Sequence, residues 1–550
     1  MESQRSFLFI ALMVVTFLLF QEWQIENAPV VEQPQAVTST ENSTNNNDND
    51  DFVPAPAAGS PVATSPTVNQ SAKLITVTTD VFEAKINSQG GDIVEVKLLQ
   101  YETEQHSGIP LTIMQNGKQK YIAQSGLTGA NGPDRLVKGR PIYHTAATSY
   151  SLADGEQSIT VPLTYIDVNG LSVTKNYIFN RANYAITVEY NITNNIATDA
   201  SVELYGQLRQ SSYVEQSSAF IPTYRGAAYS TTESLYEKYD FEDIADVNLK
   251  QTTQGGWVAM LQHYFVSAWV PKAEDNNFLY SQYKTNTGDA VIGFKAPTVI
   301  VPANQQASTS ATLYVGPKTQ DKLEKIAEGL DLTVDYGFLF MISQPLFWLL
   351  TAIQGVVGNW GIAIILITVI VKGGMYPLTK KQYTSMAKMR DLQPKITQLK
   401  ERFGDDRQKM SQGMMELYKK EKVNPAGGCL PILIQMPIFL ALYWVFLESV
   451  ELRHATFGLW IHDLSSSDPY YILPALMGLS MFVMQKMQPM TIQDPMQQKI
   501  MQYMPVVFSI FFFFFPAGLV LYWLVSNLIS IVQMKIIFSG MAKEKLKKES

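Results

Sequence analysis

The sequence predicts a multi-span α-helical membrane protein with a large all-β domain on one side of the membrane. Long apolar segments dominate the C-terminal part of the chain and predict membrane-spanning helices. Short stretches that alternate apolar and polar residues fill much of the N-terminal part and predict antiparallel strands. Lysine and arginine gather between two of the apolar segments, which indicates the orientation of the chain. We expect six transmembrane helices, five of them in a C-terminal core.

The net charge of −7 is unevenly distributed over the 550 residues. Residues 21–344 contain 35 Asp and Glu against 20 Lys and Arg, whereas residues 372–424 contain 13 Lys and Arg against 6 Asp and Glu. Basic residues near membrane spans favour the cytoplasm, so we expect the acidic block in the periplasm of a bacterial inner-membrane protein. That block contains no cysteine, which fits a domain without disulfides. The single cysteine, Cys429, is interpreted as a packed thiol.

Two segments precede the β domain. Residues 1–23 combine Arg5 with the apolar run Phe7–Phe20 and predict a signal anchor with a cytoplasmic N-terminus. The apolar run lacks a following small-x-small cleavage pair, so we expect the anchor to be uncleaved, with cleavage as the alternative. Residues 24–72 are rich in Asn, Thr, Pro, Asp and Ser and predict a disordered periplasmic tether.

Residues 73–330 are expected to form a large β sandwich that ends in a helix. Alternating stretches at Leu74–Thr78 and Ala311–Val315 predict strands, and Gln89-Gly90-Gly91 predicts a turn between strands. Thr319–Leu330 predicts the terminal helix.

Residues 331–358 are expected to hold an amphipathic helix lying on the outer membrane face. The apolar stretch Pro345–Val357 within them is too short to span a bilayer. The alternative interpretation is the outer half of the next span.

Residues 359–538 are expected to form the five-span core. Its spans are predicted at Trp360–Tyr376, Leu430–Leu447, Tyr471–Gln485, Ile500–Phe515 and Ala517–Met534. Residues 379–422 predict a cytoplasmic helical hairpin, and residues 539–550 form a basic cytoplasmic tail. Several spans are shorter than the roughly 20 residues that cross a normal bilayer, which favours local thinning of the membrane.

Lys372 is the most informative residue of the core. In a helix that begins near Asn359 it lies about 20 Å along the axis, inside the membrane's inner half. No acidic residue lies within the spans at matching depth, so the ammonium needs water or a visiting anion. The alternative is a lysine whose ammonium snorkels to the cytoplasmic headgroups.

Other candidate residues are polar or flexible side chains within the spans. Thr368 lies one helical turn before Lys372 on the same face. Gln435 and Ser526 favour a hydrated groove when taken together with Lys372, although each alone is explained by hydrogen bonding between helices. Methionines on one predicted span, including Met481 and Met484, suit varied apolar partners, with ordinary packing as the alternative.

Enzymatic functions have little support in the sequence. The 5 histidines form no His-Glu-x-x-His motif, and the chain lacks a phosphate-binding Walker loop, a Gly-x-Ser-x-Gly motif and a dinucleotide fingerprint. We therefore expect no catalytic residues, no cofactor and no metal.

Seven segments between roughly residues 340 and 540 have the character of family motifs. They are Met375-Tyr376-Pro377-Leu378-Thr379-Lys380, Leu392-Gln393-Pro394-Lys395, Val423-Asn424-Pro425-Ala426-Gly427-Gly428-Cys429, Gln435-Met436-Pro437-Ile438-Phe439, Leu459-Trp460-Ile461-His462-Asp463-Leu464, Asp494-Pro495-Met496-Gln497-Gln498-Lys499 and Gly518-Leu519-Val520-Leu521-Tyr522. Together they resemble the YidC/Oxa/Alb family of membrane protein insertases. The large insertion after the first span resembles the Gram-negative branch, in which it folds as a β-supersandwich.

The resemblance implies a groove, open to cytoplasm and lipid, that carries a cation in the second span. It also implies cooperation with the Sec translocon as well as independent insertion. Two positions depart from the Gram-negative pattern: Lys372 stands where arginine is usual, and Trp523 where tyrosine is typical beside Tyr522. Lysine lacks the planar fork of arginine, so it suffices only if charge, and not bidentate geometry, matters.

We therefore expect an insertase and chaperone that needs no bond chemistry. Lys372 attracts the acidic outer tail of a nascent membrane protein, and the apolar segment slides against Thr368, Tyr522 and Trp523 into the lipid. Further expected partners are the Sec translocon, membrane lipids and the ribosome, the last through the hairpin and basic tail. The alternatives are a transporter or channel with a polar cavity, or a membrane-tethered sugar-binding sandwich.

Overall fold

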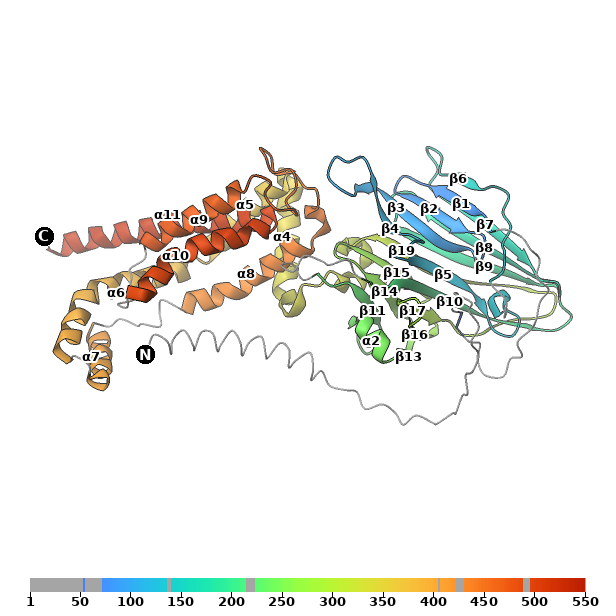
Figure 1. Cartoon of the computed structure of the whole chain (residues 1–550), viewed down its shortest axis with the longest axis horizontal. Coiled ribbons are helices and arrows are strands. Elements are labelled where there is room, and N and C mark those ends of the chain that lie inside the picture. The colour runs from blue at the N-terminus through green and yellow to red at the C-terminus, as the bar shows by residue number, and fades with distance from the viewer. Residues whose placement is uncertain are drawn as a thin grey trace.

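The computed structural model describes residues 53–54, 72–135, 140–213, 223–403, 406–421, 430–487 and 495–549. Within these residues a β domain is followed by a helical region, as the sequence predicted (Figure 1). The predicted signal anchor and nearly all of the predicted tether lie outside the described residues.

Two large sheets make up the described part of the β domain. One has 11 strands: β13 (Lys250–Gln254), β16 (Asn276–Lys284), β17 (Asp289–Lys295), β10 (Ala200–Ser211), β5 (Tyr121–Thr128), β3 (Asp92–Glu102), β2 (Phe82–Asn87), β1 (Leu74–Thr78) and β6 (Ser149–Ser151) in order, with β18 (Val299–Val301) beside β10 and β4 (Pro110–Met114) beside β3. The other has 8: β12 (Glu237–Tyr239), β11 (Gly226–Ser230), β14 (Trp257–Leu261), β15 (Phe265–Val270), β19 (Gln306–Pro317), β9 (Ala185–Asn194), β8 (Leu171–Asn180) and β7 (Ser158–Ile166). The pairings are antiparallel except that of β1 with β6.

The apolar residues that alternate along the predicted strands form the core, and the polar residues between them lie nearer the surface. Along β8 every second residue is buried, from Leu171 to Phe179. Buried residues of both sheets, such as Val96 of β3 and Val188 of β9, join one hydrophobic core. Period-two alternation gives each strand one apolar face, and the two faces cover each other.

The predicted terminal helix is shorter than expected. Only Gln320–Leu323 forms an α-helix (α3), and separate turns follow until a 3₁₀ turn at Leu330–Thr333. Gly329, with a φ of 76° in the left-handed region, directly precedes that 3₁₀ turn and lies beyond the end of α3. The prediction of one helix over Thr319–Leu330 was therefore wrong in length. A further short helix, α2 (Phe241–Asp246), precedes β13.

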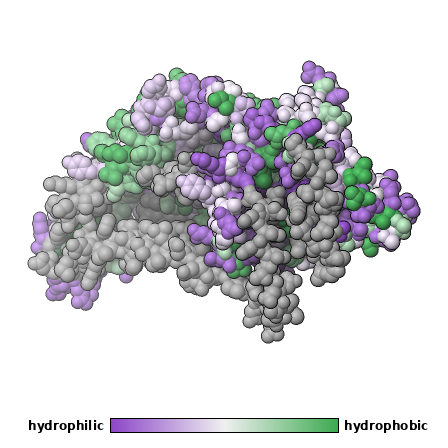
Figure 2. Space-filling model, turned by 45° about the vertical axis from the view of Figure 1, so that its right-hand side comes forward, coloured by the Kyte–Doolittle hydropathy of each residue, from purple (hydrophilic) through white to green (hydrophobic). Residues whose placement is uncertain are grey.

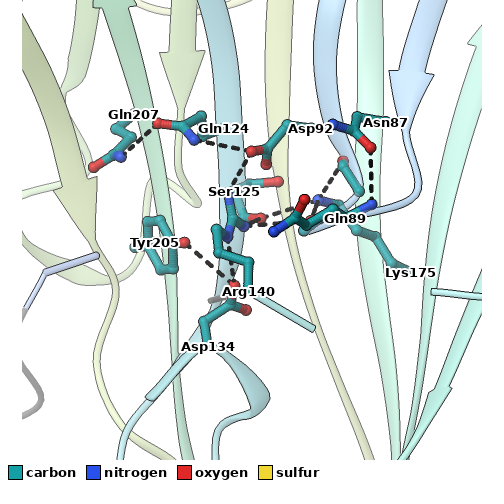
Figure 3. Close-up of polar contacts among 12 residues, drawn as sticks. Asn87, Gln89, Asp92, Gln124, Ser125, Asp134, Arg140, Lys175, Tyr205 and Gln207 are labelled. Carbon is teal, nitrogen blue, oxygen red and sulfur yellow. Dashed lines mark hydrogen bonds and ion pairs between the residues drawn. The ribbon is translucent and has the colours of Figure 1, made fainter. Parts of the chain in front are cut away.

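Lys175 of β8 connects the two sheets from a fully buried position (Figure 3). Its ammonium donates hydrogen bonds to the backbone oxygens of Gly91 at 2.8 Å, Ser125 at 3.0 Å and Gly90 at 3.1 Å. Gly90 and Gly91 have φ values of 73° and 63°, so the predicted turn depends on their glycine conformation. That conformation places both carbonyl groups within reach of Lys175.

Arg140 joins the same network with two buried carboxylates. Its guanidinium lies 2.5 Å from an oxygen of Asp92 and 2.9 Å from an oxygen of Asp134. Gln124 donates a further hydrogen bond to Asp92 at 2.9 Å (Figure 3). Lys175 adds a second positive charge to this cluster when it is protonated. Each cation has hydrogen-bond acceptors inside the protein, so we interpret the cluster as structural.

We expect the β domain to become more stable between pH 7 and about pH 9.5. Burial lowers the pKa of Lys175 from 10.5 to about 7. In this pH range the unfolded chain therefore binds a proton that the folded domain lacks, and the free energy of unfolding should rise by about 3 kcal/mol. Pulse proteolysis of the full-length protein in detergent measures this. Lys175→Met should flatten the rise, whereas Lys250→Met, at an exposed position on β13, should not. An unchanged rise in Lys175→Met would contradict the assignment.

The helical region places its helices where the sequence predicted the hairpin and core spans. It contains α4 (Phe340–Val357), α5 (Trp360–Gly374), α6 (Tyr376–Phe403), α7 (Arg407–Lys420), α8 (Leu430–Glu448), α9 (Ile472–Met487), α10 (Pro495–Phe511) and α11 (Ala517–Glu549). α11 packs against α5 and α9 and continues through the basic tail. α6, α7 and the end of α11 lie at the end of the bundle away from the β domain (Figure 1).

Length and hydropathy identify fewer spans than the six predicted. Among the described residues, Gly337–Val357 and Ala517–Lys543 are long and apolar enough to cross a membrane. α5 and α6 make a third if they count as one span bent by 65°. The remaining apolar helices are shorter, at Gln435–Glu448, Ile472–Met487 and Tyr503–Phe514. The count of six stays a prediction.

α4 is longer than the predicted interfacial helix. It begins at Phe340 and not at Pro345, and with the preceding turn it is long enough to cross a membrane. Phe347 and Leu350 are buried against the core, and this packing outweighs the one hydrogen bond that Pro345 removes. Figure 1 shows α4, in yellow, lying across the bundle at its junction with the β domain. The premise that the segment is too short to span was therefore wrong.

Apolar side chains are exposed over the helical region. They include Trp348 of α4, Val369 and Ile370 of α5, Val507 of α10 and Ile536 of α11. Figure 2 shows apolar surface, in green, at its left. Large exposed apolar surfaces mark contacts with lipid or with other proteins. This surface fits a helical region that lies in a membrane.

The β domain and the helical region meet at a polar joint. Arg453 donates to the backbone oxygens of Glu102 at 2.6 Å and Thr103 at 3.2 Å. Gln105, in the same β3–β4 loop, donates to the backbone oxygen of His462 at 2.5 Å. These contacts join the β domain to the loop between α8 and α9.

Candidate functional site

α5 presents the candidate cation, and its first turn is anchored by the loop that follows α8. Asn359 caps the helix, because its side-chain oxygen accepts a hydrogen bond from the Ile362 amide at 3.0 Å. Its amide nitrogen donates to the backbone oxygen of Phe457 at 3.0 Å. Gly361 lets the loop approach, since a Cβ there would lie 2.1 Å from the Phe457 ring. Lys372 lies about 18 Å along the helix axis from Trp360, the first residue of α5.

Lys372 is buried between α5 and α11, with 7% of its surface exposed. Its ammonium donates a hydrogen bond to the Ser530 hydroxyl at 3.1 Å. That hydroxyl in turn donates to the backbone oxygen of Ser526 at 2.8 Å. In the described part of the chain Lys372 forms no ion pair. A buried ammonium held by one hydroxyl group is under-compensated.

Polar residues continue along the same part of α11. Ser526, Asn527, Ser530 and Gln533 are all buried. Asn527 donates to the hydroxyl of Ser480 on α9 at 3.0 Å, and Gln533 donates to the backbone oxygen of Lys372 at 3.3 Å. The side-chain oxygen of Gln533 is buried and has no hydrogen-bond partner. The site thus combines a cation with an unused acceptor.

The structure brings some of the predicted residues to Lys372 and leaves others apart. Ser526 reaches it through Ser530. Thr368 is fully buried, but its hydroxyl donates to the backbone oxygen of Ile364 at 2.6 Å, within its own helix. Gln435 is half-buried on α8. The hydroxyl of Thr368 is therefore already used.

The predicted aromatic residues form a separate cluster. Tyr522 is buried and stacks on Phe439 of α8, with ring centres 5.9 Å apart. Trp523 meets Phe439 and Phe512 edge-on, at 4.6 Å and 4.7 Å. Tyr522 precedes Ser526 by one turn and Ser530 by two, so the three share one face of α11. The aromatic cluster therefore lies about 12 Å along the helix from the Lys372 contact.

The methionines divide between two packing groups. Met481 packs, half-buried, against the core that contains Tyr522, and Met484 packs beside Tyr383 and Met534. Ordinary helix packing accounts for both contacts. Their role in binding substrate stays a prediction.

Sequence reasoning missed Ser530 and Gln533. The signal was present, because Ser530 follows Ser526 by four residues and Gln533 follows Ser530 by three within an apolar helix. That spacing places all three on one face.

Comparisons with known proteins agree along the whole chain. The family models "YidC periplasmic domain" and "60Kd inner membrane protein" match residues 74–349 and 352–545. The membrane protein insertase YidC of Aeromonas hydrophila subsp. hydrophila is 53% identical over 99% of both chains, and that of Shewanella baltica is 54% identical over 100% of both. The chain belongs to the YidC family of membrane protein insertases. A crystal structure of an active YidC insertase shares 20% identity with a TM-score of 0.37, covering 84% of this chain and 92% of that chain.

Family membership fixes the broad role. Proteins of the YidC family act on nascent membrane proteins in the inner membrane, and this role is not enzymatic. The resemblance seen in the core segments is therefore confirmed, and it extends to the β domain.

We expect Ser530 to stabilise the helical region mainly through Lys372. Ser530→Ala removes the hydroxyl that the buried ammonium contacts, and should lower the free energy of unfolding by roughly 1–3 kcal/mol. In a Lys372→Met background the same change should cost much less, which a double-mutant cycle in detergent measures. Ser509→Ala, which removes a hydroxyl bonded to Pro474, should cost the same in both backgrounds. Equal costs for Ser530→Ala in both backgrounds would show that the contact is not coupled.

Proposed function

We propose that the chain inserts apolar segments into the inner membrane by attracting their acidic outer tails to Lys372. The supporting observation is a buried ammonium that has a hydroxyl contact but no ion pair among the described residues. Two unit charges 4 Å apart attract by roughly 4 kcal/mol at an effective dielectric constant of about 20, and by about 1 kcal/mol in water. A carboxylate therefore gains most from a cation in a partly dry site.

The path of the substrate follows α11 in this proposal. The tail reaches Lys372, Ser526 and Gln435 first, and the apolar segment then slides against Thr368, Tyr522, Trp523, Met481 and Met484 before it leaves sideways into lipid. Phe439 of α8 covers both aromatic rings. α8 contacts α11 less extensively than α5 and α9 do. We therefore propose that α8 moves away from α11 to admit the segment.

The membrane topology in this proposal is six spans with both termini cytoplasmic. The β domain is periplasmic, and α4 lies on the outer membrane face as an interfacial helix. Its position across the bundle, beside the β domain, supports this placement (Figure 1). The basic α6–α7 hairpin and the end of α11 lie at the opposite end, where positively charged segments favour the cytoplasm.

The proposed partners follow from the same topology. The cytoplasmic hairpin and the basic tail would contact the ribosome or anionic lipid. Cooperation with the Sec translocon and a chaperone role belong to the proposal as well. A transporter or channel is the second candidate, but the chain shows no repeated halves of the kind that many transporters have.

The charge at Lys372 should matter in proportion to the charge of the substrate's tail. Lys372→Ala and Lys372→Glu should reduce insertion of substrates with acidic outer tails by roughly tenfold or more, since tenfold corresponds to about 1.4 kcal/mol. Substrates with neutral tails, or those that travel with the translocon, should be little affected. Protease protection of a tail-charge series in a strain depleted of its own insertase measures this.

Two variants control this experiment. Lys372→Arg keeps the charge and should be tolerated. Lys535→Ala removes a lysine from the exposed side of the same helix α11 and should leave the series unchanged. With protein amounts matched, equal insertion of every substrate by Lys372→Ala would refute the electrostatic role.

A further inference from the structure

A polar pocket lies in the β domain beside the joint with the helical region. Its volume is about 360 Å³, and it is lined by the β4–β5 turn, the end of β10, the segment before β11 and the β14–β15 turn. Pockets of this size suit small ligands. His263 lines the pocket, and its Nε2 lies 2.9 Å from the backbone oxygen of Leu447 in the last turn of α8. The pocket therefore borders the side of the β domain that faces the membrane region.

The charged residues that line this pocket are both cations. They are Lys120 and Arg225, and the lining contains no Asp or Glu. Arg225 forms no ion pair with a described carboxylate, and its Nε is buried without a hydrogen-bond partner. Burial lowers the pKa of Arg225, which reflects the cost of keeping this charge partly out of water. An anion in the pocket would compensate that cost.

Gln210 adds an unused acceptor to the same wall. It lies on β10, between Tyr121 of β5 and Ala290 of β17, and only 1% of its surface is exposed. Its side-chain oxygen is buried and has no hydrogen-bond partner. An amide oxygen only accepts, so the group that satisfies it must be a donor. A ligand that satisfies both Arg225 and Gln210 is an anion that also carries a hydroxyl group.

His263 contributes no positive charge at neutral pH. Burial lowers its pKa to about 4, so the imidazole is neutral. A carbonyl oxygen only accepts hydrogen bonds, so the Nε2 that meets Leu447 must carry the proton. His263 therefore joins the pocket wall to α8, and the cation available to a ligand is Arg225.

We propose that this pocket binds a phosphate ester that carries free hydroxyl groups. The phosphate pairs with Arg225, and a hydroxyl donates to the side-chain oxygen of Gln210. A phosphoglycerol lipid headgroup and a soluble polyol phosphate share this chemistry. The site lies in the β domain and does not depend on the role proposed for Lys372.

Calorimetric titration of the purified full-length protein in a nonionic detergent tests the proposal. The probes are glycerol 3-phosphate, short-chain phosphatidylglycerol and sulfate. Sulfate is similar in size to the phosphate group but has no glycerol hydroxyl that could donate to Gln210. We expect saturable binding of glycerol 3-phosphate, roughly tenfold tighter than that of sulfate, since tenfold is about the contribution of one neutral hydrogen bond to the Gln210 oxygen. Arg225→Gln should weaken it at least tenfold, whereas Arg225→Lys should retain much of the affinity and guards against misfolding.

Two further variants separate the contacts. Gln210→Leu should keep phosphate binding but remove the preference over sulfate. Lys250→Gln changes the charge at an exposed position of the same domain and should have no effect. Tighter binding of the short-chain lipid than of glycerol 3-phosphate would assign the site to membrane lipid, and the reverse would assign it to a soluble ligand. No saturable binding of either, or equal affinity in Arg225→Gln and the unmodified protein, would overturn the proposal.

Discussion

A buried ammonium without a counter-ion is the constraint on which the helical region depends. Lys372 costs free energy where it lies, because Ser530 replaces only part of the water that an exposed lysine keeps. The polar face of α11 and the capped start of α5 hold this side chain inside the bundle and not at its edge. A stable protein retains such an arrangement when the charge has a use. The proposed use is to attract a carboxylate that arrives with the substrate.

The β domain shows what a compensated buried charge looks like. There Arg140 forms ion pairs with Asp92 and Asp134. Lys175 donates hydrogen bonds to three backbone oxygens and connects the two sheets. Lys372 has no carboxylate partner among the described residues. The contrast between Arg140 and Lys372 separates a buried cation that is paired within the fold from one that can still bind a carboxylate.

The sequence predicted secondary structure that depends on neighbouring residues, but it did not predict contacts between residues far apart in the chain. The alternation at Leu74–Thr78 predicted β1, and the apolar run that begins at Trp360 predicted α5, which carries Lys372 in its last turn. The partner Ser530 lies 158 residues away and could be inferred only as one polar residue among several. The helix expected over Thr319–Leu330 ends already at Leu323, and α4 runs longer than expected because tertiary packing overrides Pro345. Helix propensity depends on local sequence alone and leaves out tertiary packing.

Site-specific photocrosslinking from α8 tests the central claim most directly. Gln435 is half-buried and its neighbour Met436 is exposed, so the two positions sample different sides of the same helix. With a stalled nascent chain that bears an acidic outer tail, a photoreactive residue at Gln435 should capture the tail, and Met436 should capture it far less. Neutralising the tail, or Lys372→Ala, should abolish the capture at Gln435. Capture that is equal at both positions, or that persists with a neutral tail, would contradict attraction by Lys372.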